Sequence, residues 1–236
     1  MKYDKLNRYI LIGYALTGSL HILLNEYENV HHLTKPLLMP LLLLYAVMAL
    51  RASGTTPPLA LVVALLASFL GDSFLMYETQ HPAYFMAGLG SFLLAHLAYI
   101  FLFIKTSEPV PLGMRIKKQL AILGGLLVYA VGLLFVLLPK VGALKLPLIV
   151  YAAVLSVMSM TAFLRVGERF TAHGFLVAFG SLLFVISDSL LAVNKFLTPL
   201  PYAHVWIMGT YLTAQYWIVR GVVLHEQEKS MLKNAK

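Results

Sequence analysis

Apolar residues fill most of the chain in long runs that are separated by short polar breaks. A helix needs about 20 such residues to cross the hydrocarbon of a bilayer, because every backbone polar group there must be satisfied within the segment. Eight runs meet this requirement, at residues 8–24, 33–50, 58–77, 83–104, 117–138, 146–164, 171–193 and 202–224. The pattern therefore predicts an all-α fold, a polytopic membrane bundle of eight transmembrane helices.

The breaks carry turn residues, and none is long enough to form a soluble domain. Examples are "ASGTTPP" at 52–58, "TSEPVPLG" at 106–113 and "LTPLP" at 197–201. The composition agrees, because 60% of the 236 residues are hydrophobic and only 12% are charged, whereas the surface of a soluble domain needs many more charges. We expect residues 1–236 to form a single integral membrane domain.

Lysine and arginine are distributed unequally between the two predicted sides. An even number of spans puts both termini on one side, and this side holds 14 of the 18 basic residues, against four on the other. Because basic residues collect on the cytoplasmic side, we predict cytoplasmic termini, and the cytoplasmic (inner) membrane if the chain is bacterial. The basic clusters adjoin the spans, so the net charge of +8 indicates contact with anionic membrane lipids and not with nucleic acid.

Two halves of the chain resemble each other. "GDSFL" at 71–75 aligns with "SDSLL" at 187–191, and "GSFLLAHLAYI" at 90–100 aligns with "GTYLTAQYWIV" at 209–219. This indicates a duplicated four-helix unit, roughly residues 8–105 and 117–224. Since four is even, the two copies are expected to run in the same direction, related by an axis along the membrane normal.

Only two of the ten acidic residues, Asp72 and Asp188, lie inside the predicted spans. A charge at the centre of a membrane helix costs about 2.5–3.5 kcal/mol on insertion scales, so such residues usually face the bundle interior and have a function. Their equivalent positions in the two halves predict that they meet in one central cavity. The alternative is a structural role, with each carboxyl group hydrogen-bonded to a neighbouring helix.

Two buried carboxyl groups that share one proton are suited to general acid and base catalysis on an acid-labile carbon–oxygen bond. The same pair is equally suited to a proton-coupled transporter of lipids or small molecules, and this pattern alone does not decide between the two. A purely structural or sensory protein is the third possibility.

Further polar residues accompany the aspartates and are candidates for binding a substrate. Ser181 and Lys195 share a stripe with Asp188, with Asn194 beside it; His96 and Tyr99 share a face of one helix, and Tyr211 and Gln215 share a face of another. Lys35 begins the second span, and with Lys195 it is expected to contact an anionic headgroup. Each also has a plainer interpretation, as a buried histidine, interhelical tyrosine packing or a lysine that reaches the interface.

Other chemistry finds less support. Ser73 and Ser189 lack the G-x-S-x-G turn of serine hydrolases, and the chain has no cysteine. His31 and His32 are expected in a loop beside Glu26 and Glu28, and no metal-binding spacing is evident, so no metal site is predicted. The sequence makes no prediction of oligomeric state.

Several of these segments, taken together, resemble a known family. "KPLLMPLL" at 35–42, "GDSFLM" at 71–76, "GLGSFLLAHLAYIFLF" at 88–103 and "SDSLLAVNKF" at 187–196 are similar to the YhhN-like, or lysoplasmalogenase, family of membrane proteins. The resemblance implies a hydrolase without a cofactor. Its substrate is a lysophospholipid, a lysoplasmalogen, whose vinyl ether bond is cleaved to a fatty aldehyde and a glycerophosphoethanolamine or glycerophosphocholine. It also implies that Asp72 and Asp188 are the catalytic residues.

Overall fold

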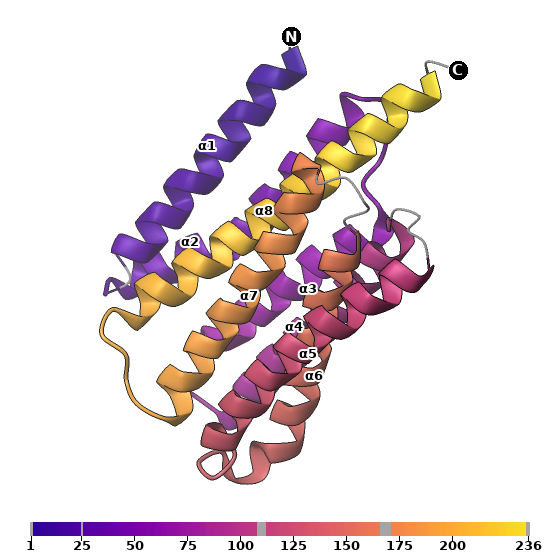
Figure 1. Cartoon of the computed structure of the whole chain (residues 1–236). Coiled ribbons are helices and arrows are strands. Elements are labelled where there is room, and N and C mark those ends of the chain that lie inside the picture. Colours follow the sequence, from indigo (N-terminus) through magenta and orange to yellow (C-terminus); the bar gives the residue numbers. More distant parts are fainter. Residues whose placement is uncertain (1, 25, 108–111, 166–170, 235–236) are drawn as a thin grey trace. The chain divides into compact units, whose positions relative to one another are not determined.

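The computed structural model describes residues 2–24, 26–107, 112–165 and 171–234. Within these residues the chain forms eight α-helices and one short 3-10 helix (Figure 1). The helices are α1 (Lys2–Leu23), α2 (Glu28–Arg51), α3 (Leu59–Leu75), α4 (Pro82–Lys105), α5 (Leu112–Leu137), α6 (Lys145–Arg165), α7 (Ala172–Phe196) and α8 (Ala203–Asn234), with η1 at Gly142–Leu144. The all-α prediction is confirmed. Three of the charged residues that lie between the predicted spans, Glu108, Glu168 and Arg169, are outside the described residues.

Among the described residues, five helical segments are long and apolar enough to cross a membrane, as an integral membrane protein requires. They are Asn29–Arg51, Pro82–Lys105, Leu120–Leu137, Gly142–Arg165 and Ala172–Phe196. The apolar helix α3 is shorter, and α1 and α8 also fall outside this group. Eight membrane-crossing helices therefore remain a prediction.

Helix α2 begins earlier than the sequence suggested, which changes the place of two histidines. His31 and His32 were expected in a loop, but both lie in the N-terminal part of α2. The prediction was wrong because the apolar run marks only the part of a helix that enters hydrocarbon, whereas backbone hydrogen bonds extend the helix into polar sequence.

The chain divides into two compact units. Unit 1 comprises the described residues of Met1–Tyr99 and Val219–Lys236, and unit 2 comprises those of Ile100–Ile218. In unit 1, α1 packs on α2 and α2 packs on α3. The end of α8 is fastened to α2, because Arg220 donates a 2.7 Å hydrogen bond to the Tyr45 hydroxyl and Gln227 donates a 3.1 Å bond to the Ala49 carbonyl.

In unit 2, α6 packs against both α5 and α7. A buried apolar cluster at Leu137, Val141 and Leu148 closes the turn between α5 and α6, and Phe196 at the end of α7 packs against it. The cluster therefore fixes the end of the helix that carries Asp188.

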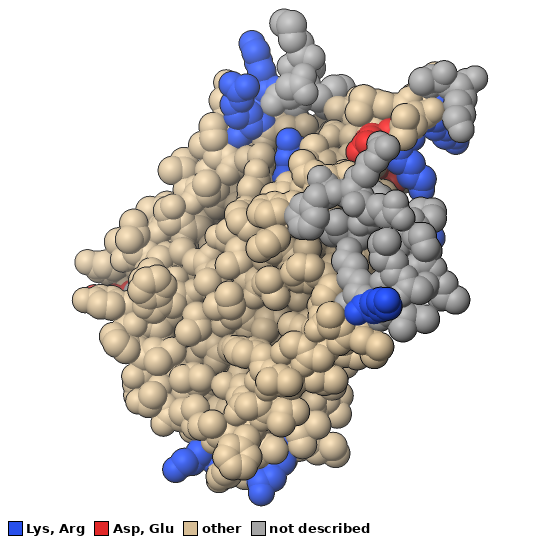
Figure 2. Space-filling model, in the orientation of Figure 1, with Lys and Arg blue, Asp and Glu red and all other residues tan. Residues whose placement is uncertain are grey.

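Most of α5 is exposed on its apolar side. Only 6% of the residues in its apolar segment Leu120–Leu137 are buried. The side chains of Val128 and Phe135 are 76% and 81% exposed. Figure 2 shows the same distribution on one face of the protein: the described surface along the middle of the helices is uncharged, and Lys and Arg lie toward the helix ends. Such a surface suits contact with lipid chains.

Candidate functional site

Asp72 lies near the C-terminal end of α3, where its side chain is buried with 3% exposure. It is the only charged residue of this helix. A buried carboxylate is costly unless other groups offset its charge, so its neighbours determine what it can do.

Two glycines hold α3 and α4 close together around Asp72. A Cβ atom on Gly71 would come within 2.7 Å of the Phe92 ring, and a Cβ atom on Gly88 would come within 2.7 Å of the Leu75 side chain. The absence of a side chain at these two positions lets the helices approach, which gives the "GD" of the α3 motif a packing role in addition to the carboxyl group.

Asp72 interacts electrostatically with Tyr14 of α1 and Lys35 of α2, and Tyr14 interacts in turn with Tyr99 of α4. All four side chains are buried. Four helices of unit 1 therefore each contribute one polar group, and we call Tyr14, Lys35, Asp72 and Tyr99 the Asp72 cluster.

Lys35, which was expected to contact a headgroup, lies in α2. Its side chain is only 9% exposed, and it interacts with the carboxyl groups of Asp72 and Glu78. A buried lysine that interacts with two carboxyl groups is suited to balancing their charge. His96, three residues before Tyr99 on α4, is also fully buried.

In unit 2, Asp188 of α7 accepts a 2.6 Å hydrogen bond from the hydroxyl of Tyr151 on α6. Tyr151 is buried and Asp188 is half-buried. Hydrogen bonds to charged groups are short and strong, so Tyr151 fixes one carboxyl oxygen of Asp188.

The serines near Asp188 donate their protons elsewhere. Ser181 donates to the Ala178 carbonyl at 2.6 Å, Ser187 to the Ile207 carbonyl at 3.0 Å and Ser189 to the Val185 carbonyl at 2.6 Å. Ser181 also contacts Ser159 of α6 at 3.0 Å. Because a hydroxyl group has a single proton, these three serines do not donate to Asp188. They serve helix packing.

Tyr211 and Gln215 lie together on α8, as their spacing predicts, and both are buried. The Gln215 amide donates to the Tyr211 hydroxyl at 3.5 Å, and the Tyr211 ring meets Phe184 of α7 edge to face at 5.5 Å. Phe184 precedes Asp188 by one helical turn, so Phe184 lies on the same face of α7 as Asp188.

The remaining two candidates lie at the C-terminal end of α7. The Asn194 side-chain oxygen accepts a 2.9 Å hydrogen bond from the Leu200 backbone, which shapes the connection to α8. Lys195, in the last turn of α7, is exposed. Of the two lysines expected at a headgroup, only Lys195 lies on the surface of its unit.

The described contacts thus group Lys35, Asp72 and Tyr99 in unit 1 and give Asp188 a partner in unit 2. The meeting of the two aspartates in one cavity stays a prediction. Sequence reasoning missed Tyr14 and Tyr151. In the sequence both are tyrosines inside apolar runs. No periodicity or repeat distinguishes them from tyrosines that only pack between helices.

Comparison with known proteins identifies the family of the chain. Residues 30–222 match the YhhN family. The chain belongs to the YhhN family. Its motifs "GDSFLM" and "SDSLLAVNKF" both fall in the matched region, so the resemblance inferred from them is confirmed.

The YhhN-family chain is similar to proteins named lysoplasmalogenase in mammals and bacteria. It is 34% identical to lysoplasmalogenase TMEM86A of Bos taurus over 164 residues, 68% of this chain and 64% of that protein. It is 30% identical to lysoplasmalogenase TMEM86B of Mus musculus over 92% of this chain and 88% of that protein. It is 33% identical to a lysoplasmalogenase of Mycobacterium tuberculosis over 68% and 59%. The match thus spans about 64% of the bovine relative's length. No solved structure matches the chain.

Proposed function

We propose that this protein is a membrane-embedded lysoplasmalogenase that hydrolyses the vinyl ether bond of lysoplasmalogens. The observation that carries the proposal is its similarity, over 92% of its length, to an enzyme named lysoplasmalogenase. The buried Asp72 and the hydrogen-bonded Asp188 supply the acid and base groups that this reaction needs.

The chemistry requires a proton donor and a water molecule. Protonation of the vinyl carbon beta to the ether oxygen gives an oxocarbenium ion, which water captures as a hemiacetal with loss of a proton. The hemiacetal then separates into a fatty aldehyde and glycerophosphoethanolamine or glycerophosphocholine, so water and the vinyl ether are the only reactants consumed. A carboxylic acid can donate the proton, and a carboxylate can stabilise the cation and activate the water.

We assign the carboxylate role to Asp72 and the acid role to Asp188. The positive charge of Lys35 favours an anion at Asp72. At Asp188, the Tyr151 hydroxyl donates to one oxygen, and this donor stabilises the carboxylate that remains once Asp188 has given its proton to the substrate. The reason for this assignment is Tyr151 and not the neighbouring serines, whose protons go to backbone carbonyls.

The proposed substrate enters from the bilayer with its alkenyl tail among lipid chains. Lys195 is exposed at the end of α7 and is the candidate for binding the phosphate. Lys35 is buried beside carboxyl groups, so we assign it to charge balance at Asp72 and not to the headgroup.

We also propose that all eight helices cross the membrane as two copies of a four-helix unit with cytoplasmic termini. The two compact units agree with this duplication in part: unit 1 contains α1–α3, α4 through Tyr99 and also the end of α8 from Val219, and unit 2 contains α5–α7, α8 through Ile218 and also the end of α4 from Ile100. In this arrangement Asp72 and Asp188 occupy equivalent helices.

An aldehyde-release assay with purified protein tests the activity. Vinyl ether lysolipids with choline and ethanolamine headgroups are the substrates, and a saturated ether lysolipid is the control. We expect Asp72→Asn and Asp188→Asn each to abolish aldehyde release. Glu226→Gln, which replaces an acidic residue near the C-terminal end of α8, should retain it. Full activity in either aspartate variant would contradict the mechanism.

A proton-coupled transporter would use the same buried aspartates, and reconstituted liposomes separate it from an enzyme. Aldehyde release that needs no proton gradient supports the hydrolase. Lipid movement that follows a proton gradient, with intact vinyl ether, would replace the hydrolase with a carrier.

A further inference from the structure

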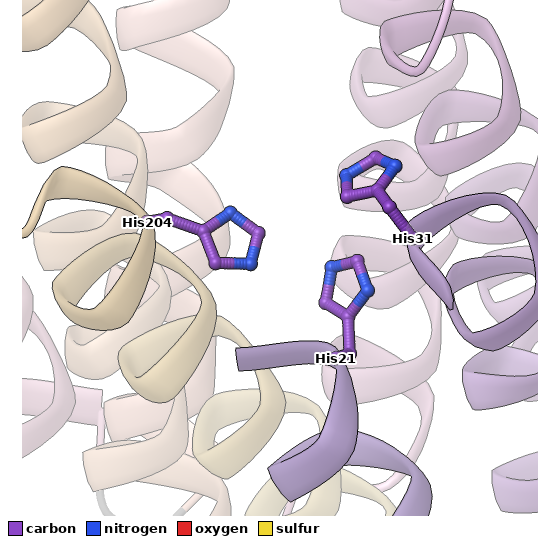
Figure 3. A group of neighbouring side chains, drawn as sticks. All are labelled: His21, His31 and His204. Carbon is purple, nitrogen blue, oxygen red and sulfur yellow. The ribbon is translucent and has the colours of Figure 1, made fainter. Parts of the chain in front are cut away.

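Two histidines of unit 1 face each other where α1 is joined to α2. His21 is in the last turn of α1 and His31 is near the start of α2. Figure 3 shows their imidazole rings, whose centroids are 4.8 Å apart. Their ligand nitrogens lie within 4.8 Å of each other. We call these two residues the histidine pair.

The pair is created by the turn between the two helices and not by a sequence motif. The Tyr27 backbone donates to the Leu24 carbonyl at 3.0 Å, and the His31 backbone donates to the Tyr27 carbonyl at 3.0 Å. The end of α1 lies beside the start of α2, because His21 contacts both His31 and Thr34. His31 therefore faces His21 because it belongs to a helix and not to a loop.

The neighbouring Thr34 fixes the tautomer of His21. Thr34 donates its only hydroxyl proton to the Val30 carbonyl at 2.7 Å, and its oxygen lies 3.0 Å from Nδ1 of His21. The oxygen must therefore accept the proton of Nδ1. In the neutral ring the lone pair is then on Nε2. A histidine whose second nitrogen donates to a fixed oxygen is the usual arrangement of metal ligands.

We propose that the histidine pair binds a divalent transition-metal ion of the zinc class. Imidazole suits zinc, copper and nickel. Two imidazole rings bound to one tetrahedral zinc, with Zn–N distances of about 2.0–2.1 Å, have ring centroids roughly 5 Å apart, and the observed separation is 4.8 Å. His21 is fully buried, so its ring is already held in place before an ion arrives.

Such an ion would connect α1 to α2 through two protein ligands, with other donors completing its coordination. The binding does not depend on lipid hydrolysis, because neither histidine belongs to the Asp72 cluster. The His31 ring lies 5.9 Å from the His32 ring, whose centroid lies 5.4 Å from that of the Tyr77 ring, so an ion bound by the pair would also stiffen the contact between α2 and the turn that follows α3.

Cobalt binding tests the proposal directly, because a tetrahedral Co²⁺ ion absorbs visible light and Zn²⁺ displaces it. The full chain is purified with an affinity tag that contains no histidine and is stripped of metal before titration. We expect one tightly bound Co²⁺ per chain, weakened at least about 10-fold in His21→Ala and His31→Ala. His81→Ala, which removes an exposed histidine of the same unit, should bind as the unchanged protein does.

The hydroxyl of Thr34 provides a second, independent measurement. Thr34→Val should weaken Co²⁺ binding about 10- to 100-fold, the effect of losing a group that orients a ligand, and Thr34→Ser should retain it. Circular dichroism and size-exclusion chromatography verify folding, and His31→Gln, at a half-buried position, decides the result if His21→Ala does not fold. Co²⁺ binding that persists in the folded His31 variants, or an unchanged protein that binds no ion, would overturn the proposal.

Discussion

Each candidate catalytic aspartate lies beside a tyrosine from another helix of the same unit. Asp72 of α3 interacts with Tyr14 of α1, and Asp188 of α7 accepts a hydrogen bond from Tyr151 of α6. A tyrosine can hold a carboxyl group in place in apolar surroundings, because one hydroxyl proton is given to the acid while the ring packs among hydrophobic side chains.

At Tyr151 this gives a prediction for activity. Tyr151→Phe removes the donor to Asp188 and retains the ring. Asp188 becomes a carboxylate as it gives its proton to the substrate, and a hydrogen bond to a charged group is worth about 1.5–3 kcal/mol. The loss of this bond in the transition state should therefore lower kcat for aldehyde release about 10- to 150-fold. Tyr129→Phe on the exposed side of α5 is the matched control. Equal activity of the two variants would remove Tyr151 from the mechanism.

Gly71 gives a prediction for stability. Gly71→Ala should lower the free energy of unfolding by about 1–3 kcal/mol, because the added methyl group would meet the Phe92 ring at 2.7 Å. Gly90→Ala on α4 has open space around it and should stabilise its helix by up to about 1 kcal/mol. Denaturation of both variants in the same detergent measures the difference, and a Gly71→Ala protein as stable as Gly90→Ala would contradict the packing role.

How much of the site the sequence predicts depends on the kind of residue. A carboxyl group in an apolar run is conspicuous because its burial is expensive, so Asp72 and Asp188 can be found without coordinates. Tyrosines are common in membrane helices for packing, and Tyr14 and Tyr151 become distinct only through their contacts. Lys35 was found, but whether a lysine near a helix start reaches the interface or turns inward depends on neighbouring helices.

At the scale of the helix, apolar runs predict where a helix exists better than where it ends. The run at 171–193 corresponds to α7 at Ala172–Phe196, whereas the run at 202–224 stops ten residues before the end of α8 at Asn234. Hydropathy does not detect the polar end of α8. There Gln227 and Ser230 donate hydrogen bonds to the carbonyls of Ala49 and Ser53.

The start of α7 offers a test at this scale. The side chain of Thr171 accepts a 3.2 Å hydrogen bond from the Gly174 backbone and so caps the helix that carries Asp188. Thr171→Ala should lower the free energy of unfolding by about 1 kcal/mol, and Thr171→Ser should change it little. Equal stability of the two variants in a denaturation experiment would show that the cap contributes nothing.

At the scale of the whole molecule, family membership follows from a few short motifs, whereas the path through the membrane does not. Five segments of the described residues satisfy the length and hydropathy of a span. The 17-residue helix α3 is short for a span, and α1 and α8 carry polar residues along with their apolar ones. The prediction of eight spans instead comes from the eight apolar runs, and the charge asymmetry predicts only which side the termini face.

Single-cysteine labelling tests this topology, and the chain is convenient for it because it contains no cysteine. Thr198→Cys, between α7 and α8, should react with a membrane-impermeant maleimide in intact cells. Ala52→Cys, after α2, should react only once the membrane is permeabilised. Both positions are exposed. Labelling of both sites in intact cells would refute the prediction of eight spans with cytoplasmic termini.

The bare apolar side of α5 has a consequence for handling the purified protein. Once the bilayer is removed, side chains such as Val128 and Phe135 must be covered by detergent. A micelle that leaves them uncovered exposes a hydrophobic surface to which other protein molecules bind. Aggregation during solubilisation should therefore begin on this helix, and polar replacements there should be the first substitutions to try when the preparation precipitates.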